Sequence, residues 1–148
     1  MQQDFNLVRF LLAQENDYVG ALQELRLGKK RTHWIWYIFP QLKGLGRSAM
    51  AETYGITGLD EARAYLAHPI LGARLKESIE AMESQYSDDA TSVLGELDAL
   101  KLKSCLTLFS CVAPSEKIFK HAIDRFFSGK LDAVTLALIS NIPQAYRE

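Results

Sequence analysis

The chain has 148 residues, of which 48% are hydrophobic and 24% are charged, a profile typical of one globular domain. Its 17 basic and 18 acidic side chains give a net charge of −1, which excludes the general attraction to nucleic acid or anionic lipid that a strongly basic chain has. We therefore expect a single all-helical domain over residues 1–148, with nucleic acid an unfavoured partner.

Three features of the sequence point to the cytoplasm. Its first residues lack the basic start and apolar core of a secretion signal, and no apolar run reaches the roughly 20 residues of a membrane span. The two cysteines, Cys105 and Cys111, would lie on diverging faces of one helix, where they cannot form a disulfide. These observations predict a cytoplasmic protein with no membrane partner.

The first 28 residues carry two helical patterns. Asp4 or Asn6 can cap a first helix that ends at Ala13. The asparagine and aspartate at residues 16–17 can cap a second helix, which Gly28 stops. Because apolar residues recur three and four positions apart in both segments, we expect a helical hairpin with one buried face.

The least ordinary stretch is the aromatic segment, residues 32–39 (THWIWYIF). Aromatic and β-branched residues favour a strand, but the sequence offers no partner strand elsewhere. Thr32 is a good helix cap and Pro40 a good stop, so we predict a helix. Since this helix would be apolar nearly all round, it should run through the middle of the domain.

Local capping signals divide the next part of the chain. Residues 42–47 read as a loop, and Ser48 is the natural cap of a short helix. A helix over residues 60–67 follows, and His68 then precedes a proline that can open a long amphipathic helix. The polar residues 84–91 are predicted to form a mobile loop.

The last third of the chain contains three more helical patterns. Residues 97–112 predict a helix whose buried stripe includes Leu100, Leu108 and Val112. Residues 114–127 predict a second, and Asp132 caps a third. The fold class predicted is therefore all-α: a compact orthogonal bundle of about eight to ten short helices around the buried aromatic helix.

Several sequence segments together resemble domain-of-unknown-function family 1810, a group of small bacterial proteins, some of which are labelled calpastatin. The segments are KRTHWIWYIFPQ (30–41), GLGRS (44–48), AYLAHPILG (64–72), DALK (98–101), SCLTLF (104–109) and DAVTL (132–136). The resemblance implies an all-helical fold and does not imply any activity. This apolar chain lacks the disorder and the repeats of a calpastatin inhibitor, so that label is set aside.

The candidate ligand-binding residues are polar or aromatic groups within residues 30–48. A buried polar group without a hydrogen-bond partner destabilises the fold by about 1–3 kcal/mol. Polar groups within this apolar sequence are therefore expected to have a structural or a functional role. Two glycines, a guanidinium and a hydroxyl ahead of a helix can also converge on an anion. The predicted ligand-binding residues are Lys30, Arg31, His33, Trp36, Gln41, Arg47 and Ser48.

Each of these residues also has a purely structural interpretation. His33 can bond to nearby backbone, Gln41 can tie its loop to a helix end, and Ser48 can simply cap a helix. Without a CxxC pair, an HExxH motif or an acidic calcium loop, neither a metal nor another cofactor is expected. Catalytic residues are unknown, and whether the protein is an enzyme stays open.

Two functions of different classes follow. The first is a binding module or enzyme that recognises a small anionic or nucleotide-like ligand through the basic and aromatic residues 30–48. The second is a non-catalytic interaction or structural protein, in which that segment is buried core and an exposed face meets a protein partner or a second copy in a homo-oligomer.

Overall fold

The computed structural model describes residues 5–140, and this part of the chain folds into nine helices with no strand. A single isolated parallel bridge joins Leu42 to Ile56. The predicted all-α bundle is confirmed. The helices are α1 (Val8–Leu27), α2 (Ile35–Ile38), α3 (Ala49–Tyr54), α4 (Leu59–Ala67), α5 (Pro69–Ser84), α6 (Ala90–Leu94), α7 (Glu96–Val112), α8 (Lys117–Phe127) and α9 (Ala133–Ser140).

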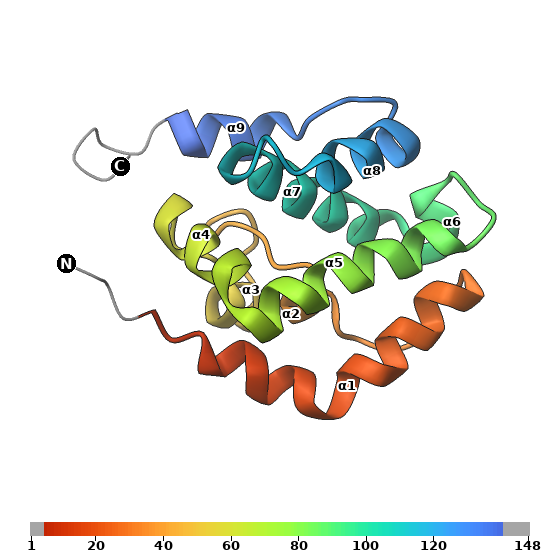
Figure 1. Cartoon of the computed structure of the whole chain (residues 1–148), viewed down its shortest axis with the longest axis horizontal. Coiled ribbons are helices and arrows are strands. Elements are labelled where there is room, and N and C mark those ends of the chain that lie inside the picture. The colour runs from red at the N-terminus through yellow and green to blue at the C-terminus, as the bar shows by residue number, and fades with distance from the viewer. Residues whose placement is uncertain (1–4, 141–148) are drawn as a thin grey trace.

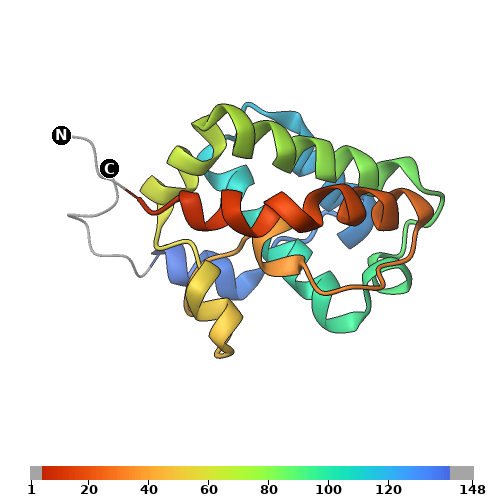
Figure 2. The same cartoon turned by 90° about the horizontal axis from the view of Figure 1, so that it is seen from below.

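Helix α5 lies along one face of the molecule, in front of the other helices in the view of Figure 1 and at the edge of the molecule in Figure 2. The long helix α1 packs along one side of α5, and α7 with α8 and α9 forms the opposite side. Helix α2 contacts α1, α3, α5 and α7, so it lies at the centre of the bundle. No helix within residues 5–140 is both long enough and apolar enough to cross a membrane.

The predicted hairpin at the start of the chain is wrong, because α1 is one continuous helix from Val8 to Leu27. Asp17 does not cap a second helix; its carboxylate instead accepts a hydrogen bond from the Tyr37 hydroxyl. Gly28 ends α1 as expected, with a positive φ of 77°. Of the two caps proposed for the first helix, Asn6 makes no cap bond and Asp4 lies outside the described residues.

The aromatic segment is central, as predicted, but its helix is much shorter than residues 32–39. Trp34, Ile35 and Phe39 are almost completely buried. Only Ile35–Ile38 is helical, and Trp34 before it has a non-helical φ of −144°. Thr32 does not cap this helix, because its hydroxyl donates to the Glu24 carboxylate. Residues 29–34 therefore form a non-helical connection beside α6, where Lys30 N–H donates to Val93 O (Figure 2).

The predicted caps of α3 and α5 are confirmed. The Ser48 hydroxyl accepts the Ala51 N–H at 3.1 Å. The His68 Nδ1 accepts the N–H groups of Ile70 and Leu71 at 3.1 and 3.2 Å, and Pro69 opens α5.

Within residues 84–91, predicted to be a mobile loop, residues 85–89 form a loop between α5 and α6, and side-chain hydrogen bonds hold it. Gln85 is buried, and its amide exchanges hydrogen bonds with the backbone of Ser87. Asp89 then caps the short helix α6 by accepting the Thr91 N–H at 3.0 Å. The Arg125 guanidinium on α8 also donates to Gln85 O at 2.8 Å, so a neighbouring helix holds this polar segment.

Helix α7 is predicted correctly to within one residue, and its buried face is predicted only in part, since Leu108 is buried as expected. Leu100, expected in the core, is 54% exposed, whereas Leu102, Cys105 and Phe109 are buried. The helix packs against α2, α4, α6, α8 and α9, and these neighbours cover most of its surface, so the apolar pattern does not single out one face. Beyond α8, the predicted cap of α9 is confirmed: Asp132 Oδ2 accepts the Thr135 N–H at 2.9 Å.

Candidate functional site

A hollow of about 260 Å³ lies between the loop after Pro40, the first half of α7 and the start of α9. We call it the Gln41 hollow. Its rim carries exposed apolar side chains, with Leu97 73% exposed and Val134 58% exposed. The residues that line it are Gln41, Leu45, Gly46, Leu97, Leu100, Lys101, Ser104, Asp132 and Val134.

Gln41 is the unusual residue of this hollow. The residue is only 8% exposed, yet its side-chain amide has no hydrogen-bond partner among residues 5–140. No fully buried side-chain nitrogen or oxygen in the same part of the chain lacks a partner. The unpaired amide atoms of Gln41 therefore reach solvent, and since Gln41 lines the hollow, that is where we place them.

The backbone on either side of Gln41 is fixed. Its carbonyl oxygen accepts the Ile56 N–H at 2.9 Å, and Lys43 N–H donates to Ile56 O at 2.8 Å. These two bonds make the isolated bridge between Leu42 and Ile56, and both of those side chains are buried. The amide is thus presented from a backbone that the core holds in place.

Three further polar residues line the Gln41 hollow, and each already interacts with other residues of the protein. The Ser104 hydroxyl donates to Leu100 O at 3.1 Å. Lys101 Nζ lies 3.3 Å from Asp98 Oδ1. Asp132 uses Oδ2 to cap α9, whereas its Oδ1 has no hydrogen-bond partner among the described residues. Residues 5–140 contain no group of three or more His, Cys, Asp or Glu side chains placed to hold a metal ion.

A second hollow of about 440 Å³ adjoins the first, because Leu97 lines both. We call it the basic-loop hollow. It lies between the connection that follows α1 and the start of α7. The residues that line it are Lys30, Arg31, His33, Leu94, Gly95, Glu96, Leu97 and Asp98.

The charges of the basic-loop hollow are partly neutralised within the protein. Lys30 has a side chain only 7% exposed, with its Nζ 2.9 Å from Asp98 Oδ2. Asp98 therefore pairs with both Lys30 and Lys101. In contrast, the side chains of Arg31 and His33 are exposed and make no hydrogen bond or ion pair within residues 5–140. These two side chains are free to meet a ligand at this rim, as is the exposed side chain of Glu96, which makes no hydrogen bond or ion pair within residues 5–140 either.

A single carboxylate, Glu24 on α1, organises the connection that carries Arg31 and His33. It accepts the N–H groups of Arg31 and Thr32 at 2.8 and 3.0 Å. It also accepts the Thr32 hydroxyl at 2.7 Å and the indole Nε1–H of Trp34 at 2.9 Å. Burial alone would raise the pKa of Glu24, but these four hydrogen bonds outweigh it and lower the pKa to about 2.

We expect Glu24→Gln to destabilise the protein by about 2 kcal/mol at neutral pH, because the amide cannot accept all four hydrogen bonds. Since the native pKa of about 2 lies below the usual 4.5, the wild-type advantage is complete above pH 4.5 and declines as the pH falls toward 2. Urea unfolding of both proteins between pH 7 and pH 2.5 checks this. A stability difference that stays constant over that range would contradict the assigned role of the carboxylate.

The seven predicted ligand-binding residues do not line one common cavity. Lys30, Arg31 and His33 line the basic-loop hollow, and Gln41 lines the Gln41 hollow. Because Leu97 lines both hollows, these four residues lie in two neighbouring hollows on either side of Leu97.

The other three predicted residues line neither hollow. Trp36 is half-buried beside the Gln41 hollow, with Lys101 Nζ 5.9 Å from its ring centroid. Arg47 is exposed on the loop before α3, and Ser48 is occupied as the cap of that helix. The sequence did not indicate Asp132 or Leu97 as site residues. Asp132 was recognised only as a helix cap, and no local pattern shows that Leu97 faces a hollow.

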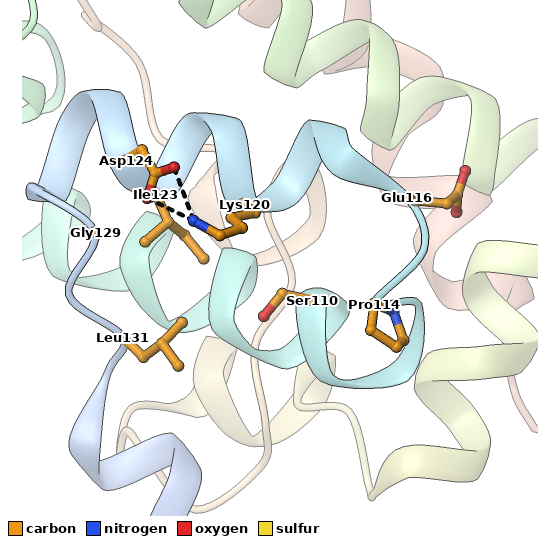
Figure 3. A pocket seen from close by; sticks show the side chains of 8 residues that line it. All are labelled: Ser110, Pro114, Glu116, Lys120, Ile123, Asp124, Gly129 and Leu131. Carbon is orange, nitrogen blue, oxygen red and sulfur yellow. Dashed lines mark hydrogen bonds and ion pairs between the residues drawn. The ribbon is translucent and has the colours of Figure 1, made fainter.

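A third hollow, also about 260 Å³, lies between the end of α7, helix α8 and the segment that joins α8 to α9 (Figure 3). Figure 3 shows Ile123 and Leu131 facing its interior. Its polar side chains already have partners: Lys120 pairs with Asp124, and Glu116 pairs with Lys76 on α5. With no unpaired buried polar group to orient a ligand, this hollow is a weaker candidate than the Gln41 hollow.

Comparison with known proteins identifies the family of this chain but no activity. A search of the curated proteins found no match. The conserved hypothetical protein Rv1873 from Mycobacterium tuberculosis has a crystal structure with a TM-score of 0.89 and 40% sequence identity; the match covers 92% of this chain and 97% of that one. The family described as "Protein of unknown function (DUF1810)" matches residues 4–139. Neither description names a function. The resemblance noted from the sequence is thus confirmed, and the chain belongs to the DUF1810 family.

Proposed function

We propose that the protein binds a small nucleotide-like ligand, with its flat polar ring in the Gln41 hollow and its anionic part toward Arg31 and His33. The observation that carries this proposal is the amide of Gln41, which is held in a residue that is only 8% exposed and yet bonds to no group within residues 5–140. An amide hydrated in this way adds little to folding stability. A ligand with a donor and an acceptor side by side would supply its missing partners.

The two neighbouring hollows support a ligand with two chemically different ends. The Gln41 hollow, at about 260 Å³, is smaller than the roughly 300–1,000 Å³ of pockets that take drug-sized ligands, so it suits one ring system. Leu45, Leu97 and Leu100 give it the apolar walls that a ring requires. Beyond Leu97, the unpaired guanidinium of Arg31 is suited to a phosphate or carboxylate.

We expect at least one nucleoside monophosphate to bind the purified protein and to raise its melting temperature, because a ligand that binds only the native state stabilises it. Gln41→Leu should weaken that binding at least tenfold, about 1.4 kcal/mol, while leaving the melting temperature of the free protein unchanged or higher. Isothermal titration calorimetry with the four ribonucleoside monophosphates, combined with thermal melts, measures both effects.

Gln85 is the matched control for Gln41. It is buried to a similar extent, but its amide makes hydrogen bonds to Met82 O, Ser87 O and Ser87 N–H. Gln85→Leu should therefore lower stability by about 2 kcal/mol and leave nucleotide affinity unchanged. The proposal fails if no nucleotide binds, or if Gln41→Leu lowers the melting temperature without changing affinity.

A second candidate function is the docking of a protein segment or a second copy on the same surface. It is favoured by the large exposed apolar side chains of Leu97, Leu100 and Val134 around the hollow. It would become the better explanation if nucleotides do not bind and Leu97→Asp alters the sedimentation behaviour of the protein. For either function we propose a cytoplasmic location, supported by the two free thiols, Cys105 and Cys111.

A further inference from the structure

We infer that Asp132 makes the Gln41 hollow selective for a heteroaromatic ring that bears an exocyclic amino group, as adenine and cytosine do. This inference rests on the proposed function and specifies the ligand of that same site. Asp132 lines the Gln41 hollow together with Gln41 and offers a carboxylate oxygen that no described residue occupies.

Gln41 alone does not choose between an amino-substituted ring and a keto-substituted one. A side-chain amide presents one acceptor and one donor group side by side, which match a ring amino group and the ring nitrogen beside it. Rotation of the amide by half a turn exchanges its donor and acceptor, and it then matches a ring carbonyl beside a ring N–H. The two kinds of ring would therefore bind Gln41 about equally well.

Asp132 has no such freedom. Its Oδ2 accepts two hydrogen bonds from Thr135, from the backbone N–H at 2.9 Å and from the hydroxyl at 2.5 Å. Its own backbone N–H donates to the Thr107 hydroxyl at 2.9 Å, which ties the start of α9 to α7. The remaining oxygen, Oδ1, is an acceptor only, because an ionised carboxylate has no proton to donate.

A ring amino group has two hydrogens, and the two residues can divide them. One hydrogen is donated to Gln41 Oε1, and the other is donated to Asp132 Oδ1. A carbonyl at the same ring position would place its oxygen against Asp132 Oδ1, so that two acceptors would face each other with no hydrogen between them. A site built to form hydrogen bonds binds such a ligand much more weakly. The cation that lines this hollow, Lys101, is paired with Asp98 and forms no ion pair with Asp132.

The test compares two nucleotides that differ only in this ring substituent and in the proton on the ring nitrogen N1 beside it, adenosine monophosphate (amino) and inosine monophosphate (keto). We expect the wild-type protein to bind adenosine monophosphate at least about tenfold more tightly in calorimetric titrations. Asp132→Asn keeps an oxygen for the helix cap, since asparagine caps as well as aspartate does, but directs an NH₂ group into the hollow. That variant should lose the preference for adenosine monophosphate or reverse it.

Thr135→Val is the control for a merely structural role of Asp132. Thr135 is fully buried, and the substitution removes the hydroxyl bond to Asp132 Oδ2 without touching Oδ1. It should change the melting temperature and leave the ratio of the two affinities as it is. Equal binding of both nucleotides by the wild type, or equal changes in that ratio from both variants, would overturn the inference and leave the proposed function standing. Binding of neither nucleotide or of any other monophosphate would remove the proposed function itself.

Discussion

Replacing Gly72 by alanine is expected to destabilise the protein by about 3 kcal/mol or more, because the new methyl group has no space. A Cβ at residue 72 would lie 2.1 Å from the backbone oxygen of Leu66 at the end of α4. That oxygen cannot easily move away, since His68 both ends α4 and caps α5, and Pro69 follows it directly. Helices α4 and α5 would have to separate. Urea unfolding at neutral pH measures the loss.

Gly20, in the middle of α1, is the control for this substitution. A Cβ built there meets no atom within 4 Å, and the residue is helical. Gly20→Ala should therefore stabilise the protein by roughly 0.5–1 kcal/mol, the usual difference between glycine and alanine in a helix. The contrast separates close helix packing from helix propensity. A stabilising effect at both positions would show that α4 and α5 are not in close contact at residue 72.

The features predicted correctly from the sequence are those fixed by neighbours in the chain. The caps at Ser48, His68 and Asp132 all involve backbone N–H groups within three residues of the capping side chain. Such contacts form whatever the rest of the fold does, so a short pattern is enough to find them. The central position of the aromatic segment also follows from its composition alone, because an apolar stretch without a polar face must be buried.

The errors arose where a side chain is used by a distant part of the chain. Asp17 has the chemistry of a helix cap, but Tyr37 on α2 takes its carboxylate, and α1 continues through the predicted break. Thr32 also looked like a cap, and its hydroxyl is instead bonded to Glu24 on α1. A local pattern shows that a residue can cap a helix and does not show which partner it has in the folded protein.

For the same reason, only part of the candidate site could be recognised in the sequence. Gln41, Lys30 and Arg31 stood out as polar groups next to an aromatic segment. The opposite walls, Leu97 on α7 and Asp132 before α9, come from far along the chain and carry no unusual local pattern. Only the folded structure brings them to Gln41, and only it shows which amide lacks a partner.

The buried ion pair between Arg9 and Glu61 should have the other large effect on stability. Glu61 is 1% exposed, and its Oε2 lies 2.9 Å from Arg9 Nη1. The same guanidinium donates to the carbonyl oxygens of Thr53 and Gly55 at 2.8 and 3.0 Å. One side chain of α1 thereby fixes both the end of α3 and the start of α4. Arg9→Met leaves the Glu61 carboxylate buried without its cation, and we expect a loss of about 3–5 kcal/mol.

The double variant Arg9→Met with Glu61→Leu distinguishes a buried charge from lost packing. If the uncompensated carboxylate causes most of the damage, removing it should restore part of the stability, so the double variant is less destabilised than the sum of the single ones. The exposed pair of Lys120 and Asp124 provides the comparison, and Lys120→Met should change stability by no more than about 0.5 kcal/mol. Additive losses at Arg9 and Glu61 in urea unfolding would mean that the two side chains act independently. Arg9 would then matter for the carbonyl oxygens that it holds and not for the charge of Glu61.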